Sequence, residues 1–231
     1  MARKKVVIVI VEGISDEMAL EGSLRNLYRS KEVRFKVVRS DITSDRNSSS
    51  NNIKAKVAEL IKSEMSRFSL DREDILKVIH IVDMDGAYIN EDAIKESSEI
   101  QEFKYTETHI LAPSIEKVVE RNERKAKNLN VLSCLNKINV SLDYSLYYFS
   151  CNQEHVLHNL IDVPDNQKRT LAEKFNDQYE DNLDEFKDFI TSEEFAVKGS
   201  YLETWEFIKK DNNSLKRFSN IHLLLKEENL I

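Results

Sequence analysis

The chain has 231 residues, of which 34 are basic and 41 acidic, so its net charge is −7. Hydrophobic residues make up 41% of the chain and charged residues 32%, which is typical of a soluble globular protein. The longest apolar run, Val6–Val11, is far shorter than the roughly 20 residues that span a bilayer, so we expect no membrane association. Two cysteines exclude a zinc finger and a disulfide scaffold, and the first residues lack a signal-peptide cleavage site. Together these features predict a cytoplasmic protein.

The acidic charge is concentrated in one segment. Residues 171–195 carry nine acidic side chains and two lysines, so the rest of the chain is neutral overall. Because the field at a binding site depends on the charges around it, the acidic balance of the whole chain does not exclude a nucleic acid as partner.

Hydrophobic patterning predicts alternating strands and helices in the first 85 residues. The run of valine and isoleucine at Val6–Val11 is typical of a strand buried on both faces of a parallel sheet. Apolar residues spaced by three and four positions indicate two amphipathic helices. The predicted elements are a strand at Val6–Val11, a helix at 16–28, a strand at 33–40, a helix at 53–68 and a strand at 75–82. This order is the pattern of an open, doubly wound α/β sheet.

The rest of the chain is predicted to complete the sheet and then to become helical. We expect a strand at 105–111, a helix from Pro113 to about residue 128, a strand at 143–150 and a short helix at 153–161. Residues 1–163 should therefore form an α/β domain with a mostly parallel sheet and helices on both faces. Residues 164–231 should form an acidic, mainly helical extension. Its expected core contacts are Phe175, Phe186, Phe189, Phe195 and Trp205.

Acidic residues follow the two most apolar strands. Glu12 comes directly after the first, and Asp83 and Asp85 come after the third. Ligands of open α/β sheets bind outside the carboxyl ends of the strands, so these acids should converge if the two strands are neighbours. On an extended chain, the side chains of Asp83 and Asp85 would point to the same side. Carboxylates this close raise one another's pKa, and a divalent cation with oxygen ligands, most often Mg²⁺, relieves the repulsion.

Two segments resemble motifs of the TOPRIM family. Residues 12–20 read EGISDEMAL after an apolar strand, similar to the first TOPRIM motif, E-G-x-x-D-x-x-A-L. Residues 80–86 read HIVDMDG, similar to the second motif, in which a strand ends in D-x-D and a glycine. TOPRIM domains occur in primases, topoisomerases, ribosomal-RNA maturases and nucleases. The length of the chain and its two cysteines favour the small OLD-like and RloB-like nucleases.

The resemblance implies a nuclease that depends on Mg²⁺ or Mn²⁺ and cleaves phosphodiester bonds of RNA or DNA, as in phage-defence effectors. It implies that Glu12 is a metal-linked acid–base group and that Asp83 and Asp85 hold the ion. Asp16, one helical turn beyond Glu12, is a further candidate ligand, with a first-turn helix acid as the alternative. Glu154 lies where OLD-like and RloB-like relatives carry another acid. This last motif departs from the family, because residues 148–154 read YFSCNQE and lack its Asn-Pro-x-Phe-Glu form.

Basic and polar residues near the predicted sheet edge are candidate substrate contacts. Lys117, Arg121 and Arg124 are the main candidates, in a base-rich helix that also carries Lys125 and Lys127. These residues could contact backbone phosphates, although a solvated helix face explains them as well. Asp41 opens a serine-rich loop after the second strand, which could touch phosphate or simply form a turn.

Other interpretations stand beside the nuclease. Glu12 could be a surface acid at a strand end, and Asp83 could simply cap a loop. A TOPRIM-like module that does not cut could act through a protein partner, for which the acidic segment 171–195 is suited. A phosphotransfer receiver domain shares the α/β plan but needs an acidic pair at the end of its first strand. The resemblance implies a nucleic acid and an ATPase as partners, and the ATPase would be a separate chain because this one has no P-loop. A second copy of the chain is a further expected partner.

Overall fold

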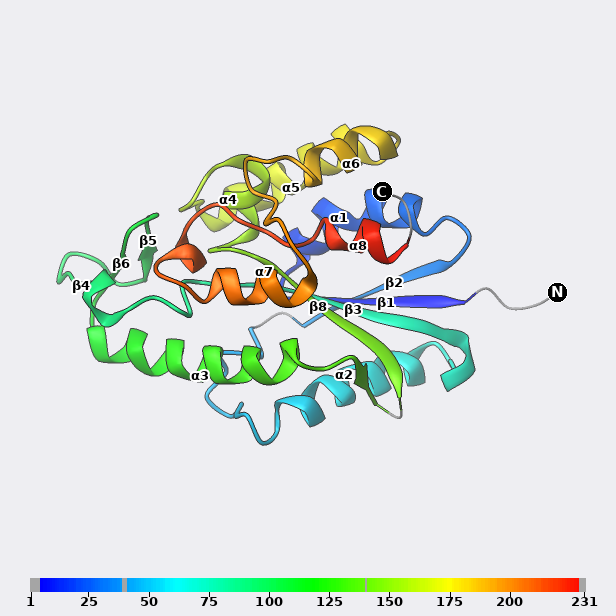
Figure 1. Ribbon diagram of the computed structural model, residues 1–231, viewed down its shortest axis with the longest axis horizontal. Coiled ribbons are helices and arrows are strands. Elements are labelled where there is room, and N and C mark those ends of the chain that lie inside the picture. The colour runs from blue at the N-terminus through cyan, green and yellow to red at the C-terminus, as the bar shows by residue number, and fades with distance from the viewer. Residues whose placement is uncertain (1–4, 39–40, 140, 229–231) are drawn as a thin grey trace.

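The computed structural model describes residues 5–38, 41–139 and 141–228, and its centre is a five-stranded sheet (Figure 1). The strands lie in the order β2 (Glu32–Val37), β1 (Val6–Val11), β3 (Ile75–Asp83), β8 (Leu142–Phe149) and β7 (Lys137–Ile138). The first four are parallel, and β7 pairs antiparallel with β8. The predicted mostly parallel α/β sheet is confirmed, and β1 lies between β2 and β3. The predicted strand at 33–40 ends at Val37, and residues 39–40 lie outside the described residues.

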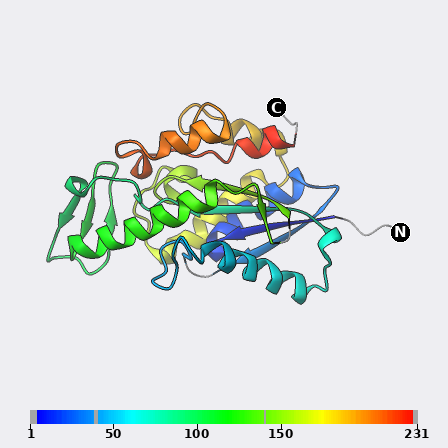
Figure 2. The same cartoon turned by 60° about the horizontal axis from the view of Figure 1, so that its bottom comes forward.

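Helices cover both faces of the sheet because the central strands are apolar on both sides. All six residues of β1 are fully buried, with Val7, Val9 and Val11 in one core and Val6, Ile8 and Ile10 in the other. The first face is covered by α1 (Ile14–Leu27), α4 (Gln153–His158), α5 (Asp165–Tyr179), α6 (Leu183–Ile190) and α8 (Leu223–Glu227). The second is covered by α2 (Ile53–Arg67), α3 (Ile115–Ser133) and α7 (Tyr201–Ile208), and α2 and α3 lie side by side in Figure 2.

A small second sheet projects from one end of the molecule, at the left of Figure 1. It consists of β4 (Ile94–Glu96), β6 (Ile110–Ala112) and β5 (Lys104–Tyr105) in that order. The prediction of one strand at 105–111 is therefore wrong. The chain reverses after Tyr105, since the Thr106 side chain accepts from His109 N and donates to His109 O, and β5 returns antiparallel as β6.

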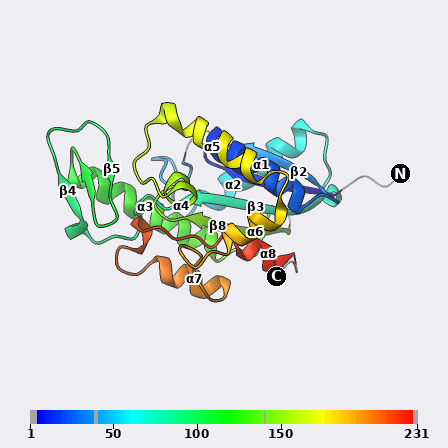
Figure 3. The ribbon, with the colours of Figure 1, turned by 90° about the horizontal axis from the view of Figure 1, so that it is seen from above.

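The residues after 163 share both cores with the sheet. Helix α5 packs along α1 (Figure 3), where a side-chain carbon on Gly22 would come within 2.3 Å of Glu180 Cβ. The last described segment crosses β8, with a bridge between Phe149 and Ser219. Of the five predicted core contacts, Phe175, Phe186, Phe195 and Trp205 are buried and Phe189 packs half-buried against them. No helix within the described ranges is both long and apolar enough to cross a membrane.

We predict that α5 unfolds together with the sheet. Phe175 in α5 is 3% exposed, and Phe175→Ala should lower the free energy of unfolding by about 3–5 kcal/mol because a large buried ring is lost. Urea denaturation followed by circular dichroism and by the fluorescence of Trp205, which lies on the opposite face, should shift by the same amount. Leu202→Ala is the control, since Leu202 is 67% exposed and the change should stay within about 0.5 kcal/mol. An unchanged Trp205 transition in Phe175→Ala would mean that α5 unfolds separately from the core on the opposite face of the sheet.

Candidate functional site

The carboxyl ends of four parallel strands bring acidic residues to one edge of the sheet. Glu12 follows the last residue of β1, and Asp83 is the last residue of β3, which pairs with β1. Asp41 comes from the loop after β2, and Glu154 from the first turn of α4, just after β8. The condition for this convergence is met, since the first and third predicted strands are neighbours. Side chains more than 140 residues apart in sequence meet there as a result.

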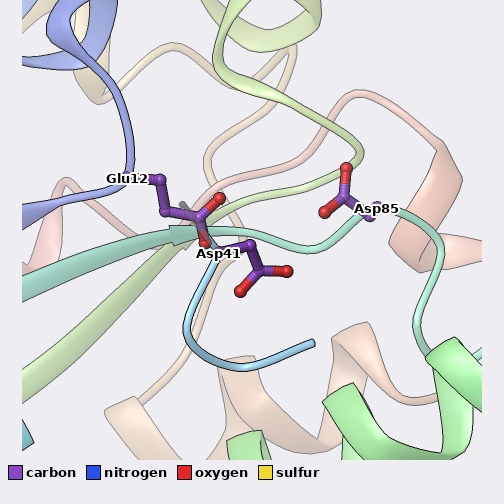
Figure 4. A group of neighbouring side chains, drawn as sticks. All are labelled: Glu12, Asp41 and Asp85. Atoms are coloured by element: carbon purple, nitrogen blue, oxygen red, sulfur yellow. The ribbon is translucent and has the colours of Figure 1, made fainter. Parts of the chain in front are cut away.

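Glu12 and Asp41 form a compact triad with Asp85. One carboxylate oxygen each of Glu12, Asp41 and Asp85 lies within 4.8 Å of the others, and Figure 4 shows the three groups converging from the loops after β1, β2 and β3. Their side chains are 17–20% exposed. Oxygen ligands at this spacing suit a hard divalent cation, so the triad could bind a metal ion.

The two acids of the D-x-D segment separate. Asp85 joins the triad, whereas Asp83 lines a cleft together with Asp16 and Glu154. The expectation that Asp83 and Asp85 point the same way is wrong because the chain does not stay extended. It turns at Asp85 (φ 49°) and Gly86 (φ 69°), and Asp85 N donates to Cys151 O at 2.8 Å. Glycine is required at 86, since a Cβ there would lie 2.7 Å from a methyl group of Leu215.

A buried lysine sits against the triad. The side chain of Lys125, from α3, is 0% exposed, and its Nζ donates to Asp85 Oδ2 at 2.5 Å and to Asp41 Oδ2 at 2.7 Å. Glu12 Oε1 lies 3.9 Å from the same nitrogen. Burial alone would lower the pKa of Lys125, but the carboxylates of Asp41 and Asp85 raise it well above its ordinary value, so the group is an ammonium ion.

The same lysine fixes the charge of Asp41. Burial alone would raise the pKa of Asp41, but the Lys125 ammonium lowers it well below its usual range. The other carboxylate oxygen, Oδ1, accepts from the backbone nitrogens of Thr43 (2.7 Å) and Ser44 (3.2 Å). Of the two interpretations of this loop, the turn is therefore observed, and Asp41 also contributes to the triad.

The three predicted substrate contacts of α3 have different surroundings. Arg121 is 13% exposed; it donates to Asp85 O at 2.8 Å and to the Tyr105 hydroxyl at 2.8 Å, and lies over the rings of Phe103 and Tyr105. It therefore supports the turn at Asp85. Arg124 donates to Ser44 O at 2.8 Å, and Lys117 is exposed. Contact of these three residues with a phosphate backbone stays a prediction.

The remaining acids line an open cleft of about 790 Å³ beside the triad. It contains every acid predicted as a ligand except Asp85, and the first turns of α5 form one wall of it. Its charged lining residues are Glu12, Asp16, Asp41, Asp83, Glu154, Asp165, Lys168 and Arg169. Asp16 also accepts from Gly13 N at 2.7 Å, so it caps α1 and faces the cleft at once.

The acids of the cleft are poorly neutralised. Burial raises the pKa of Asp83 well above its ordinary value, and the nearby carboxylates of Asp16 and Glu12 raise it further. The pKa of Glu12 is also well above its usual range, through burial first and then through Asp41. Burial raises the pKa of Asp16 to about 6 and that of Glu154 in the same direction. The carboxylates at this edge are therefore stabilised when they bind protons or another cation.

Sequence reasoning placed Lys125 in the base-rich helix as a possible phosphate contact but missed it as the partner of the acids. The available signal was its position on α3, where it falls in helical register with the apolar residues Val118, Leu129 and Leu132, all buried. A lysine on a buried helix face needs an anionic partner. Lys168 and Arg169 were also missed, since nothing in the sequence places α5 beside the cleft.

We predict that Asp83 destabilises the metal-free protein at high pH. The pKa of Asp83 is higher in the folded than in the unfolded protein, so the folded state loses stability as pH rises from about 4 through the folded pKa. In a chelating buffer at pH 8, Asp83→Asn should therefore raise the free energy of unfolding by about 1–3 kcal/mol. The gain should vanish near pH 4. It is measured by urea denaturation at both pH values.

The native protein and Asp83→Asn share every other ionisable group, so the difference between their stabilities cancels the contributions of those groups. His80, whose pKa burial lowers to about 3, gives an opposite pH dependence but gives it equally in both proteins. Asp188→Asn, at an exposed position of α6, is the control and should change little at either pH. Equal stability of the native protein and Asp83→Asn at pH 8 would contradict this account of the cleft.

Comparisons of the chain with protein-family models, with curated proteins and with solved structures gave no match in any of the three. The resemblance to TOPRIM domains therefore rests on the two sequence motifs and stays a prediction.

Proposed function

We propose that the protein is a metal-dependent nuclease that hydrolyses phosphodiester bonds of RNA or DNA. The observation that carries this proposal is the cleft, in which five carboxylates from four strand ends and α1 face one open volume with two basic residues on its wall. A surface acid at a strand end explains one such residue but not their convergence. The two TOPRIM-like motifs provide Glu12, Asp16, Asp83 and Asp85 to this edge, which gives independent support.

The residues present fit a divalent cation. Glu12 Oε1 is buried and has no hydrogen-bond partner among the described residues, which leaves an oxygen lone pair free for a cation. Carboxylate oxygens are the donors that Mg²⁺ and Mn²⁺ prefer. Glu12 would hold the ion, together with Asp83 or Asp85 and with Asp16 or Glu154 as further ligands.

The bound cation would polarise the scissile phosphate and offset the charge that develops during hydrolysis. Glu12 is suited to accept a proton from the attacking water, because it faces the cleft and because burial and the carboxylate of Asp41 raise its pKa, which makes it a stronger base. Lys168 and Arg169 are suited to orient the phosphodiester from the opposite wall through charge-assisted hydrogen bonds. Lys125 supplies a fixed positive charge behind Glu12.

The proposal includes the partners that the resemblance implies. These are a nucleic acid substrate, a separate ATPase and a second copy of the chain, in a role such as phage defence. The alternative function is a module that binds a protein partner through the acidic segment 171–195 and does not cut. The cleavage assay described next distinguishes the two functions.

Glu12→Gln and Asp83→Asn should each lower the cleavage rate by at least about 100-fold, since each removes a charged group from the reacting centre. Asp85→Asn should also abolish cleavage, because it breaks the pairing with Lys125. The assay uses purified protein with Mg²⁺ or Mn²⁺ on plasmid DNA and on total transfer RNA, with circular dichroism to verify folding.

Glu99→Gln, an exposed acid between β4 and β5, is the matched control and should cleave at the native rate. Native rates in all three site variants would show that the site is misassigned. Absence of cleavage by the native protein on both substrates, with and without a candidate ATPase, would favour the binding module.

Lys168→Ala should weaken binding of the nucleic acid and reduce the slope of log K against log salt concentration by about 1, since one phosphate contact is lost. The measurement uses a catalytically inactive Glu12→Gln background, so that the substrate stays intact during a titration by fluorescence anisotropy. Lys174→Ala on the same helix is the control, because Lys174 is exposed and outside the cleft lining. Equal salt slopes for the two variants would exclude Lys168 as a phosphate contact.

A further inference from the structure

The triad of Glu12, Asp41 and Asp85 already holds a cation that belongs to the chain. The Lys125 ammonium lies 2.5 Å and 2.7 Å from two of its oxygens, which is the range of charge-assisted hydrogen bonds. The lysine side chain is 0% exposed, so water does not compete for these contacts.

Helix α3 holds the lysine in place. Asn122 donates to Gly86 O at 3.0 Å, next to Asp85, and Asn128 donates to Thr43 O at 2.7 Å, two residues after Asp41. Both side chains lie on the buried face of α3, one on each side of Lys125. The helix that carries the ammonium is therefore held against the two loops that carry its partners.

Negative charge is balanced differently on the two sides of Glu12. In the triad, three carboxylates face the Lys125 ammonium, and the Arg121 guanidinium lies 3.9 Å from Asp85. On the cleft side, Asp16, Asp83 and Glu154 face two basic residues that are already paired. The Lys168 ammonium lies 2.8 Å from Asp165, and Arg169 lies 3.0 Å from Glu173. A divalent cation entering this edge meets fixed positive charge in the triad and uncompensated negative charge in the cleft.

We propose that Lys125 occupies, as a built-in cation, the position in the Glu12–Asp41–Asp85 triad that a metal ion would take, so that the protein binds a single divalent cation on the cleft side. This inference rests on the proposed function and specifies its metal site. Glu12 is shared between the ammonium and the ion, and Asp83 is the second principal ligand, with Asp16 and Glu154 completing the set. Lys125 is thus a positioning residue that sets the number and place of the metal ions.

The test measures Mn²⁺ binding directly and needs no substrate. Free Mn²⁺ is titrated by electron paramagnetic resonance in the presence of the full chain. The native protein should bind one ion. Asp83→Asn should weaken the binding of this ion by at least about 10-fold, because it removes a charged ligand and even the loss of a group that only supports a ligand typically costs that much. Asp41→Asn, which removes a triad oxygen that holds Lys125, should weaken the binding clearly less than Asp83→Asn does.

A lysine variant tests the built-in cation itself. Lys125→Met keeps the unbranched shape and most of the length of the side chain and removes its charge, so the freed triad should take up a second ion. Lys117→Met on the exposed part of the same helix is the matched control and should still bind one. Circular dichroism establishes whether Lys125→Met folds. If it does not, the native stoichiometry and the comparison of Asp83→Asn with Asp41→Asn still decide the inference.

The outcomes separate this inference from the function on which it rests. Two ions bound by the native protein, an equal loss of affinity in Asp41→Asn and Asp83→Asn, or one ion bound by folded Lys125→Met would each overturn the role of Lys125 and leave a metal-dependent enzyme in place. No Mn²⁺ bound by the native protein would overturn the metal-dependent function itself.

Discussion

The buried ammonium of Lys125 is the interaction on which the carboxyl edge of the sheet depends. Asp41 and Asp85 come from loops after different strands, and both bond to this one nitrogen. Without it, two carboxylates in a weakly solvated site would repel each other, and removing one partner of a buried ion pair typically costs about 3–5 kcal/mol. The lysine therefore joins α3 to the loops after β2 and β3 and brings their acids beside Glu12.

Backbone geometry and side-chain charge act together at this edge. The left-handed turn at Asp85 and Gly86 directs one acid of the D-x-D segment toward Lys125 and leaves Asp83 facing the cleft. Contacts from distant segments hold this turn, since Gly86 N donates to Ser214 O and Arg121 donates to Asp85 O. Two adjacent acids of one motif thus obtain different electrostatic surroundings, one paired with an ammonium and the other among carboxylates.

The C-terminal extension is part of the site as well as part of the core. The first turns of α5 contribute Asp165, Lys168 and Arg169 to the wall of the cleft. The same helix is held against α1 through Phe175 and the close approach at Gly22. Since α1 begins directly after Glu12, the packing that stabilises the extension also sets the distance between the basic wall and the acids it faces.

The sequence by itself determined the sheet and most of its acids, because these depend on local patterns. A buried strand needs apolar residues on both sides, so Val6–Val11 was recognisable, and the acids that follow such strands mark the carboxyl edge. The small sheet was not predictable, because a reversal at Thr106 depends on side-chain hydrogen bonds within one short turn. Tertiary structure alone decided that Asp85 turns away from Asp83, that Asp41 joins Glu12, and that Lys125 lies between them. Each of these depends on contacts between segments far apart in the chain. Neither the spacing of apolar residues nor the spacing of motifs predicts which acidic residue a buried lysine will contact.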